Sequence, residues 1–303
     1  HTEGLLALRI TKKGEPLVHR ENTKREQDLS HDRTKSRLLD ASDPFLVAVG
    51  ISDAKGHVKP SKMDKYKQVE EFLRLLMPTL TSAISAGHIH QPTESNPLTI
   101  VDLGCGHAYL TFATHQYLRS QGVAVKVIGI DVRTAARDRN NEIARQLGIE
   151  KTIEFRAEEI ADTTLKGADI SIALHACDTA TDDAIAWTVN SDAKLALIAP
   201  CCHHDIQAQM NEIPEPWSLL TRNGIMKERL GDLLTDALRM QIMKLRGYRV
   251  EAIEFVGGEH TPRNLMIRAV KTGAVADPAE ERKYEEMLTL WKVKPALATL
   301  LNR

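Results

Sequence analysis

Short apolar runs alternate with amphipathic segments through the middle of this chain. The runs are rich in Val, Ile and Leu, which is typical of buried strands. The segments between them carry one apolar face, as helices packed on a sheet do. Repeated strand–helix units of this kind predict a doubly wound α/β sheet with parallel strands. The pattern places strands at 98–103, 125–131, 152–156, 169–174 and 194–199, and helices at 109–121, 134–147, 179–189 and 203–210.

The pattern changes towards the C-terminus. A charged helix of about residues 226–246 precedes two further strands, at 249–256 and 264–271. Only the segment GGEHTPR separates these strands, so we expect them to pair as a hairpin. The hairpin adds an antiparallel strand, and the whole is predicted to be a seven-stranded, mostly parallel sheet.

Three flanking segments complete the expected organisation. Residues 1–60 read as a charged arm that holds a β-hairpin near 5–18 and a short helix. An amphipathic helix at 61–87 opens a main domain that extends to residue 274 and packs on its sheet. Residues 275–303 read as a C-terminal helical tail, broken at Pro295 because proline interrupts helices.

The most informative stretch is LTIVDLGCGHAYL, which joins the first strand of the domain to its helix. Gly104 and Gly106 let the backbone turn sharply and approach a nucleotide-type ligand. Tyr109 stands where a dinucleotide-binding loop has its third glycine, and Asp102 precedes the loop. A carboxylate there would repel a pyrophosphate but suits the cationic methionine part of S-adenosylmethionine. The stretch therefore resembles the cofactor loop of class I S-adenosylmethionine-dependent methyltransferases, although a single DxGxG also occurs in ordinary turns.

The ends of the next two strands extend this interpretation. Asp131 closes the second strand 25 residues after Gly106, where an acid can hold the two ribose hydroxyls. Taken alone, such a residue more often caps the following helix. Glu158 follows the third strand, in a position suited to adenine contact. Because these features occur in order and in strand context, together they favour a bound cofactor.

Polar residues also follow the remaining strands, and parallel strand ends meet at one edge of a sheet. Each cluster alone fits a structural role: a helix-capping turn, buried thiols or a hydrophilic hairpin loop. Their convergence predicts an acceptor site that faces the transferred methyl group. The residues are His175, Cys177 and Asp178 after the fourth strand, Cys201, Cys202 and His203 after the fifth, and Glu259, Arg263 and Asn264 in the hairpin loop.

Three chemistries could use this edge. Methyl transfer to oxygen or nitrogen needs orientation and a base, for which His175, Asp178 or His203 would serve. Methyl transfer to a pyrimidine carbon needs a thiolate that adds to the ring, and Cys201 or Cys202 stands near where RNA cytosine-C5 methyltransferases have it. A zinc site of Cys177, Cys201, Cys202 and a histidine is the third option. Adjacent cysteines lack the usual ligand spacing, so we expect no metal.

A narrower resemblance rests on the segments HACDTATDDAI and APCCHH. They are similar to the Methyltransf_32 group, which includes the methyltransferase domains of methyltransferase-like 25 and of GST C-terminal-domain-containing proteins. The similarity spans about residues 61–271 and implies a Rossmann-like domain that binds S-adenosylmethionine. It implies that Lys65 and Gln68 face the cofactor or substrate cleft, although a helix face exposed to solvent explains these two residues equally well. It also implies that His175 touches the cofactor. Ala108 departs from the group, which more commonly has glycine there.

Composition bears on the substrate. The net charge is −1, yet the first 68 residues carry 14 Lys and Arg against 10 Asp and Glu. Arg33, Lys35 and Arg37 lie among Ser, Thr and His, residue types that contact phosphates. We therefore expect an RNA acceptor, ribosomal RNA included, although interspersed acids dilute the positive field. Protein or small-molecule methylation and a catalytically inactive binding module remain alternatives.

Composition also bears on the compartment. No apolar run approaches the roughly 20 residues of a membrane span. No signal-peptide pattern opens the chain, and its four cysteines suit a reducing environment. We therefore expect a cytoplasmic protein with no membrane partner.

Overall fold

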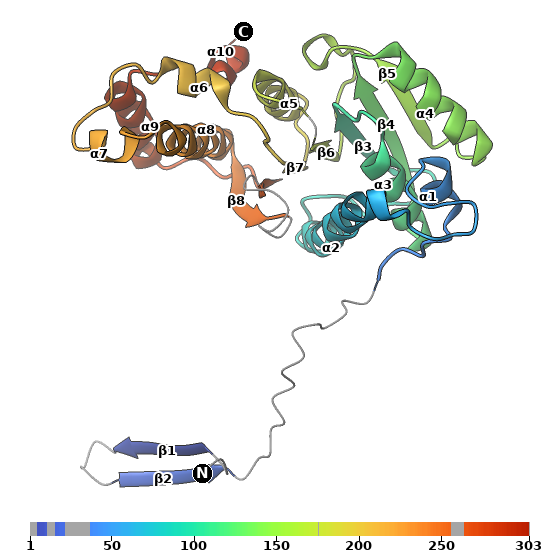
Figure 1. The fold of residues 1–303 in the computed structure, drawn as a ribbon, viewed down its shortest axis with the longest axis horizontal. Helices are drawn as coiled ribbons and strands as arrows, with labels where there is room; N and C mark the ends of the chain where they lie inside the picture. The colour runs from blue at the N-terminus through green and yellow to red at the C-terminus, as the bar shows by residue number, and fades with distance from the viewer. Residues whose placement is uncertain (1–4, 11–15, 22–36, 175, 256–263, 303) are drawn as a thin grey trace. The chain divides into compact units, whose positions relative to one another are not determined.

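The computed structural model describes residues 5–10, 16–21, 37–174, 176–255 and 264–302. The chain divides into two compact units, residues 1–37 and residues 38–303. The first unit contains an antiparallel pair, β1 (Leu5–Ile10) and β2 (Pro16–Glu21), in which Leu5 pairs with Glu21 (Figure 1). A hairpin was expected here, and its second strand extends three residues further than predicted.

The second unit is built on a seven-stranded sheet in the order β5-β4-β3-β6-β7-β9-β8. All strands are parallel except β9, which is antiparallel to both of its neighbours. This confirms the predicted doubly wound, mostly parallel sheet with its terminal hairpin. The strands are β3 (Leu98–Leu103), β4 (Val125–Asp131), β5 (Ile153–Ala157), β6 (Ile170–Ala173), β7 (Leu195–Ile198), β8 (Tyr248–Glu254) and β9 (Leu265–Lys271).

Helices cover both faces of the sheet, as Figure 1 shows. Successive strand residues point to opposite faces, so Ile100 joins one apolar core and Val101 the other. The first core contains side chains of α1 (Pro44–Ala48), α2 (Met63–Ser85), α3 (Tyr109–Ser120) and α4 (Thr134–Gln146). The second contains side chains of α5 (Thr179–Asn190), α6 (His204–Gln209), α8 (Gly224–Leu245), α9 (Pro278–Trp291) and α10 (Ala296–Leu301). A short helix, α7 (Ser218–Thr221), and two 3-10 turns, Pro60–Lys62 and Ile160–Asp162, complete the described elements.

The segment 38–60 does not continue the charged arm. Phe45, Leu46 and Ile51 are buried in the first core. Glu70 of α2 accepts hydrogen bonds from the backbone amides of Leu38 and Leu39 at 2.7 and 3.3 Å. The boundary therefore lies at residue 37 because the short apolar stretch around residues 45–51 packs against α2 and α3.

The C-terminal tail also belongs to the second unit. Trp291 and Leu297 are buried in the second core. Lys292 ends α9 in the left-handed conformation (φ 52°), and Pro295 precedes α10, which confirms the predicted break. No helix among the described residues is long and apolar enough to cross a membrane.

Candidate active site

The glycine loop after β3 owes its shape to three left-handed backbone positions. Gly104, Gly106 and Ala108 have φ values of 78°, 56° and 58°. A side chain at position 104 would approach the backbone nitrogen of Ala176 to 3.4 Å, and one at position 106 would approach Arg133 to 3.2 Å. Glycine is thus required where the loop is tight, and α3 begins directly after it. Ala108 adopts the conformation that glycine favours, which explains why glycine is commoner at that position in similar loops.

Asp102 is buried at the carboxyl end of β3. Its Oδ2 accepts a hydrogen bond of 2.5 Å from the Thr111 hydroxyl. Burial raises the pKa of this carboxyl to about 7, although the bond from Thr111 opposes the shift. The carboxyl is therefore half protonated near neutral pH, and a cation beside it would favour its ionised form.

Asp131 lies one strand away and is bonded on all sides. Its Oδ1 accepts from the backbone and side-chain nitrogens of Arg133 at 3.0 and 2.8 Å. Its Oδ2 accepts from the Gly106 amide at 2.9 Å and from Arg133 Nη2 at 3.0 Å. Burial alone would raise the pKa of Asp131, but these bonds outweigh it and lower the pKa. A carboxylate offers about four acceptor sites, so ribose hydroxyls would have to displace the exposed Arg133 guanidinium.

Glu158, which the sequence suggested for adenine contact, lies along the same edge. The Glu158 amide donates to the Asp131 carbonyl at 3.2 Å, and the Glu158 carboxylate accepts from Thr163 at 2.8 Å. Asp131 and Glu158 are therefore neighbours, in the arrangement expected for ribose and adenine.

The first turns of α2 reach the glycine loop. Lys62, which precedes the helix, places its ammonium 5.9 Å from the centre of the Tyr109 ring. One turn on, Lys65 donates to the Gln68 amide oxygen at 3.0 Å. Burial and the nearby Lys62 lower the pKa of Lys65. The suggestion that Lys65 and Gln68 face the cofactor or substrate cleft stays a prediction.

On the acceptor side, Asp178 joins two loops. Its backbone has φ 52° and ψ −122°, an unusual conformation for a residue with a side chain. Its Oδ1 accepts from the backbone amides of His204 and Asp205 at 2.9 and 3.3 Å. The carboxylate therefore connects the loop after β6 to the first residues of α6. The role as a base, which the sequence suggested, remains a prediction beside this structural one.

His203 is buried between two carboxylates of α8. Its Nε2 lies 2.9 Å from Asp236 Oδ1 and its Nδ1 lies 3.3 Å from Asp232 Oδ1. Arg239, one turn further along α8, lies 3.3 Å from the same Asp236 oxygen. The two carboxylates orient the imidazole, which nothing in the sequence around His203 indicated.

Arg239 completes this network and is only 2% exposed. Its Nε and Nη2 donate to the two carboxylate oxygens of Asp182 at 2.9 and 2.7 Å. Nη2 also donates to the Asp178 carbonyl at 2.9 Å. Sequence reasoning missed this network, although Asp232, Asp236 and Arg239 recur at intervals of four and three residues in a helix predicted to be charged. That spacing puts them on one face and could have marked it as buried.

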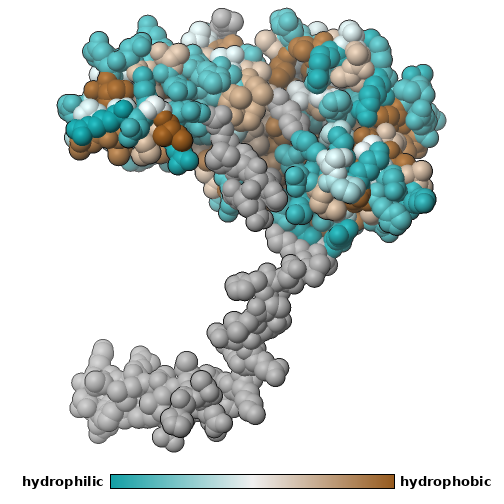
Figure 2. All heavy atoms as spheres, in the orientation of Figure 1, coloured by the Kyte–Doolittle hydropathy of each residue, from teal (hydrophilic) through white to brown (hydrophobic). Residues whose placement is uncertain are grey.

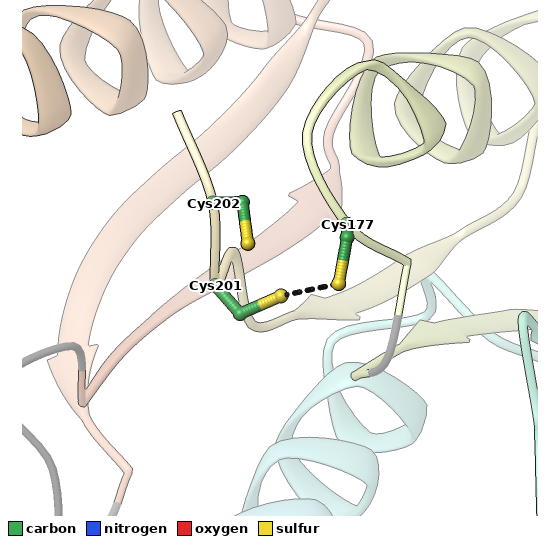
Figure 3. A group of neighbouring side chains, drawn as sticks. All are labelled: Cys177, Cys201 and Cys202. Atoms are coloured by element: carbon green, nitrogen blue, oxygen red, sulfur yellow. Dashed lines mark hydrogen bonds between the residues drawn. The ribbon is translucent and has the colours of Figure 1, made fainter. Parts of the chain in front are cut away.

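The three cysteines of the two motifs come together. The Sγ atoms of Cys177, Cys201 and Cys202 all lie within 4.8 Å of one another, and the Cys177–Cys201 distance is 3.0 Å (Figure 3). The adjacent Cys201 and Cys202 thus both approach Cys177, although their spacing in sequence is not the usual spacing of metal ligands. Burial, reinforced by the neighbouring thiols, raises the pKa of Cys201 far above its ordinary value. Such a thiol is a poor source of thiolate, which weighs against ring addition by Cys201. Cys105 is buried apart, in the glycine loop.

A groove of about 890 Å³ begins beside this cluster. Its walls combine Cys201 and His203 with Asn264 and the first half of α8. Charged and apolar side chains alternate along α8, where Ile225 and Leu233 are strongly exposed. Figure 2 shows hydrophobic side chains in brown scattered among hydrophilic ones in teal over the face in view. The groove has the size and mixed lining of a binding site for a substrate or part of one.

The remaining predicted residues are placed only in part. Asn264 lines the groove and Arg37 is exposed, while their roles in substrate binding stay predictions. Five predicted residues lie outside the described part of the chain, namely Arg33, Lys35, His175, Glu259 and Arg263.

Comparison with solved structures returns methyltransferases at low identity. The Podospora anserina methyltransferase PaMTH1 with bound S-adenosylhomocysteine is 12% identical, with 79% of this chain and 91% of that chain covered and a TM-score of 0.45. Magnesium protoporphyrin IX methyltransferase from Synechocystis PCC 6803 is 15% identical, with 76% and 93% covered and a TM-score of 0.43. Ribosomal protein L11 methylase from Lactobacillus delbrueckii subsp. bulgaricus is 14% identical, with 63% and 76% covered and a TM-score of 0.36. These likenesses carry no argument about the acceptor.

Comparison with sequences is more specific. No curated protein matches the chain. Residues 64–209 match the family model Methyltransf_32, described as a methyltransferase domain. The match begins in α2 and ends in α6, so it contains the glycine loop, Asp131 and both cysteine motifs. Residues 64–209, just under half of the chain, therefore resemble the Methyltransf_32 family and identify this protein as a methyltransferase.

Proposed function

We propose that this methyltransferase acts on RNA, ribosomal RNA included. The observation that supports this acceptor is the positive surplus of the first 68 residues in a chain whose net charge is −1. Lys and Arg placed among Ser, Thr and His suit contacts to a phosphate backbone. Arg37, at the end of the first unit, is exposed and accessible to such a partner.

The donor half of the site is assigned to the edge formed by β3, β4 and β5. Asp102 would face the cationic methionine end, Asp131 the ribose and Glu158 the adenine. Gly104 and Gly106 adopt positive φ values that favour glycine, and without side chains they would let a ligand approach the backbone. S-adenosylmethionine supplies a methyl group already activated on sulfur, so the protein has mainly to position donor and acceptor.

The acceptor half favours transfer to oxygen or nitrogen. Burial and the neighbouring thiols raise the pKa of Cys201, which disfavours Cys201, one of the two candidate nucleophiles, for addition to a pyrimidine ring. His203 lines the groove, and Asp236 lies 2.9 Å from its Nε2. Its Nδ1 faces Asp232 at 3.3 Å, so His203 could accept the proton that the acceptor loses only if the acceptor replaces Asp232 at this nitrogen.

A small molecule is the second candidate acceptor, and one observation favours it. The groove beside Cys201 has a volume of about 890 Å³ and includes the exposed side chains of Ile225 and Leu233. Clefts of a few hundred to about 1,000 Å³ commonly enclose compact ligands. An RNA helix with all its bases stacked would leave such a groove largely unfilled.

Methyl transfer from radiolabelled donor decides between these acceptors. The full chain would be incubated with total RNA, with protein extract and with a small-molecule extract in separate reactions. We expect label in RNA and none with Asp131→Ala. Label in the small-molecule fraction alone would favour the second candidate. Tight binding of the donor with no transfer to any fraction would indicate a binding module instead.

The cytoplasmic location expected from the composition is also part of this proposal. Imaging of the tagged chain in cells would test it.

A further inference from the structure

The three clustered thiols come from neighbouring strands of the sheet. Cys177 follows β6, and Cys201 and Cys202 follow β7. The two strands pair in parallel, with Ala173 opposite Ile198 at their carboxyl ends. The loops that follow therefore leave the sheet side by side. In Figure 3 the three side chains point into one common space.

The separations of the sulfur atoms suit a single ion. In a tetrahedral zinc site with Zn–S bonds of about 2.3 Å, neighbouring sulfurs lie about 3.8 Å apart. The Cys177–Cys201 distance of 3.0 Å falls below that value, and the upper bound of 4.8 Å for the group lies above it. The separation that zinc requires therefore lies between the one short distance and the upper bound for the group. Cys201 and Cys202 supply two of the ligands from one loop, and Cys177 supplies the third from the neighbouring loop.

The loops are already held in place. Asp178, next to Cys177, accepts hydrogen bonds from the His204 and Asp205 amides at 2.9 and 3.3 Å. The Asp178 carbonyl in turn accepts from the buried Arg239 at 2.9 Å. These bonds tie the loop after β6 to the loop after β7 without using a thiol. A site with its ligands positioned in advance loses little conformational entropy when it binds an ion.

We propose that Cys177, Cys201 and Cys202 bind one zinc ion, with a fourth coordination position open towards the groove. Among the described residues the group contains three potential ligand atoms, and Cys177 is exposed. Three protein ligands and one open position are typical of zinc ions that contact a substrate or water. Cys201 also lines the groove, so the open position would lie at the end of it. The proposal does not depend on the identity of the methyl acceptor.

Binding replaces three S–H bonds by three Zn–S bonds and releases the thiol protons to the solvent. No oxidant or reductant takes part. Because zinc replaces the thiol protons, affinity should fall as the pH is lowered.

Titration with Co²⁺ tests the site on the full chain, reduced and stripped of metal under anaerobic conditions. Cobalt bound to thiolates absorbs in the near ultraviolet and, in tetrahedral sites, in the visible. We expect both bands to saturate at one equivalent and to disappear when Zn²⁺ is added. Cys177→Ser and Cys201→Ser should each weaken binding by about 100-fold. The matched control is Cys105→Ala, which alters the remaining cysteine and should leave the titration unchanged.

Each result of the titration either supports or overturns the zinc site. Absence of thiolate-to-metal absorption at one equivalent would overturn the proposal, as would Cys177→Ser binding as tightly as the parent chain. A reduced chain that takes up no metal, yet forms a Cys177–Cys201 disulfide in air, would also overturn it and identify a redox pair. Circular dichroism of each variant shows whether it is folded, and the exposed Cys177 offers the substitution least disruptive to the core. Since no methyl donor is present, failure here leaves the proposed methyl transfer untouched.

Discussion

The two halves of the site lie on one sheet edge but are constructed differently. On the cofactor side, Asp131 is bonded by groups close to it in sequence, with the most distant, Gly106, 25 residues away. On the acceptor side, Arg239 reaches Asp182 across 57 residues, and His203 reaches Asp236 across 33. A local loop shapes the first half, whereas a network of distant charged residues assembles the second.

Because of this difference, we expect the cofactor side to contribute mainly to ligand binding and the acceptor side mainly to the stability of the fold. Polar groups on the cofactor side remain able to exchange their partners for a ligand, since Arg133 is largely exposed. Arg239 and Asp182 on the acceptor side are nearly inaccessible and satisfy each other. Removing one member of a buried ion pair leaves a charge without compensation. Substitutions should therefore affect binding on one side and folding on the other.

The largest expected effect concerns the buried pair. Arg239→Met should lower the free energy of unfolding by about 3–5 kcal/mol because it leaves Asp182 buried and uncompensated. Urea unfolding monitored by circular dichroism measures the loss. Lys244→Met is the control, since its ion pair with Glu280 lies on the exposed surface of the same helix, and its midpoint should stay close to that of the parent chain. Equal midpoints for both variants would show that the network does not stabilise the fold.

The counterpart on the cofactor side is Asp131→Ala. Loss of hydrogen bonds to a charged group should weaken binding of S-adenosylmethionine by about 100-fold, or roughly 3 kcal/mol. Isothermal titration calorimetry measures the affinity, and a melting curve without ligand shows whether the variant is folded. Undiminished affinity would mean that the ribose is held elsewhere, and the comparison between the two halves would break down.

Asp102 makes a prediction about pH. Its pKa of about 7 lies above the ordinary value of 3.8, so the folded state favours the protonated carboxyl. Its contribution to stability is therefore present below about pH 4 and is lost as the pH rises towards 7. A cationic ligand needs the ionised form, so affinity for S-adenosylmethionine should rise by up to about tenfold from pH 6 to pH 8. Calorimetry at several pH values tests this, and Asp102→Asn should flatten the profile. A rise that persists in Asp102→Asn would assign the proton to another group.

The smallest effect is expected from Arg133. Arg133→Met removes the guanidinium that occupies both oxygens of Asp131, which ribose hydroxyls must otherwise displace. Since exposed ion pairs contribute up to about 1 kcal/mol, binding of S-adenosylmethionine should tighten by no more than about fivefold. The Arg139→Met variant, altered in the helix α4 that follows Arg133, provides a control for the loss of positive charge. Weaker binding by Arg133→Met alone would show that this arginine contacts the ligand.

Much of the fold was predictable because its determinants are local. The buried strands from β3 to β7 are short apolar runs, and their predicted bounds agree with the structure to within about one residue. The loop with Gly104 and Gly106 was recognisable because positive φ values favour glycine. The segment 38–60 was assigned to the arm although residues 45–51 form an apolar run without charges, and the structure shows that this run is part of the first core.

The acceptor side was predictable in its residue types but not in their contacts. The sequence places Asp178, His203 and three cysteines at adjacent strand ends. It does not reveal that Asp178 bonds the start of α6, that His203 lies between two carboxylates of α8, or that Cys201 and Cys202 both face Cys177. Each contact depends on how α8 and the two loops are placed, which is decided far from the motifs in sequence.

The sequence by itself determined the α/β sheet and the glycine loop of this methyltransferase, because periodicity, glycine positions and strand-end acids act over short stretches of chain. Tertiary structure alone decided which charged groups stabilise the fold, where the first unit ends and that three thiols share one space. Burial and pairing are properties of neighbours in space, and in the network around Arg239 those neighbours lie as far as 61 positions apart in the chain.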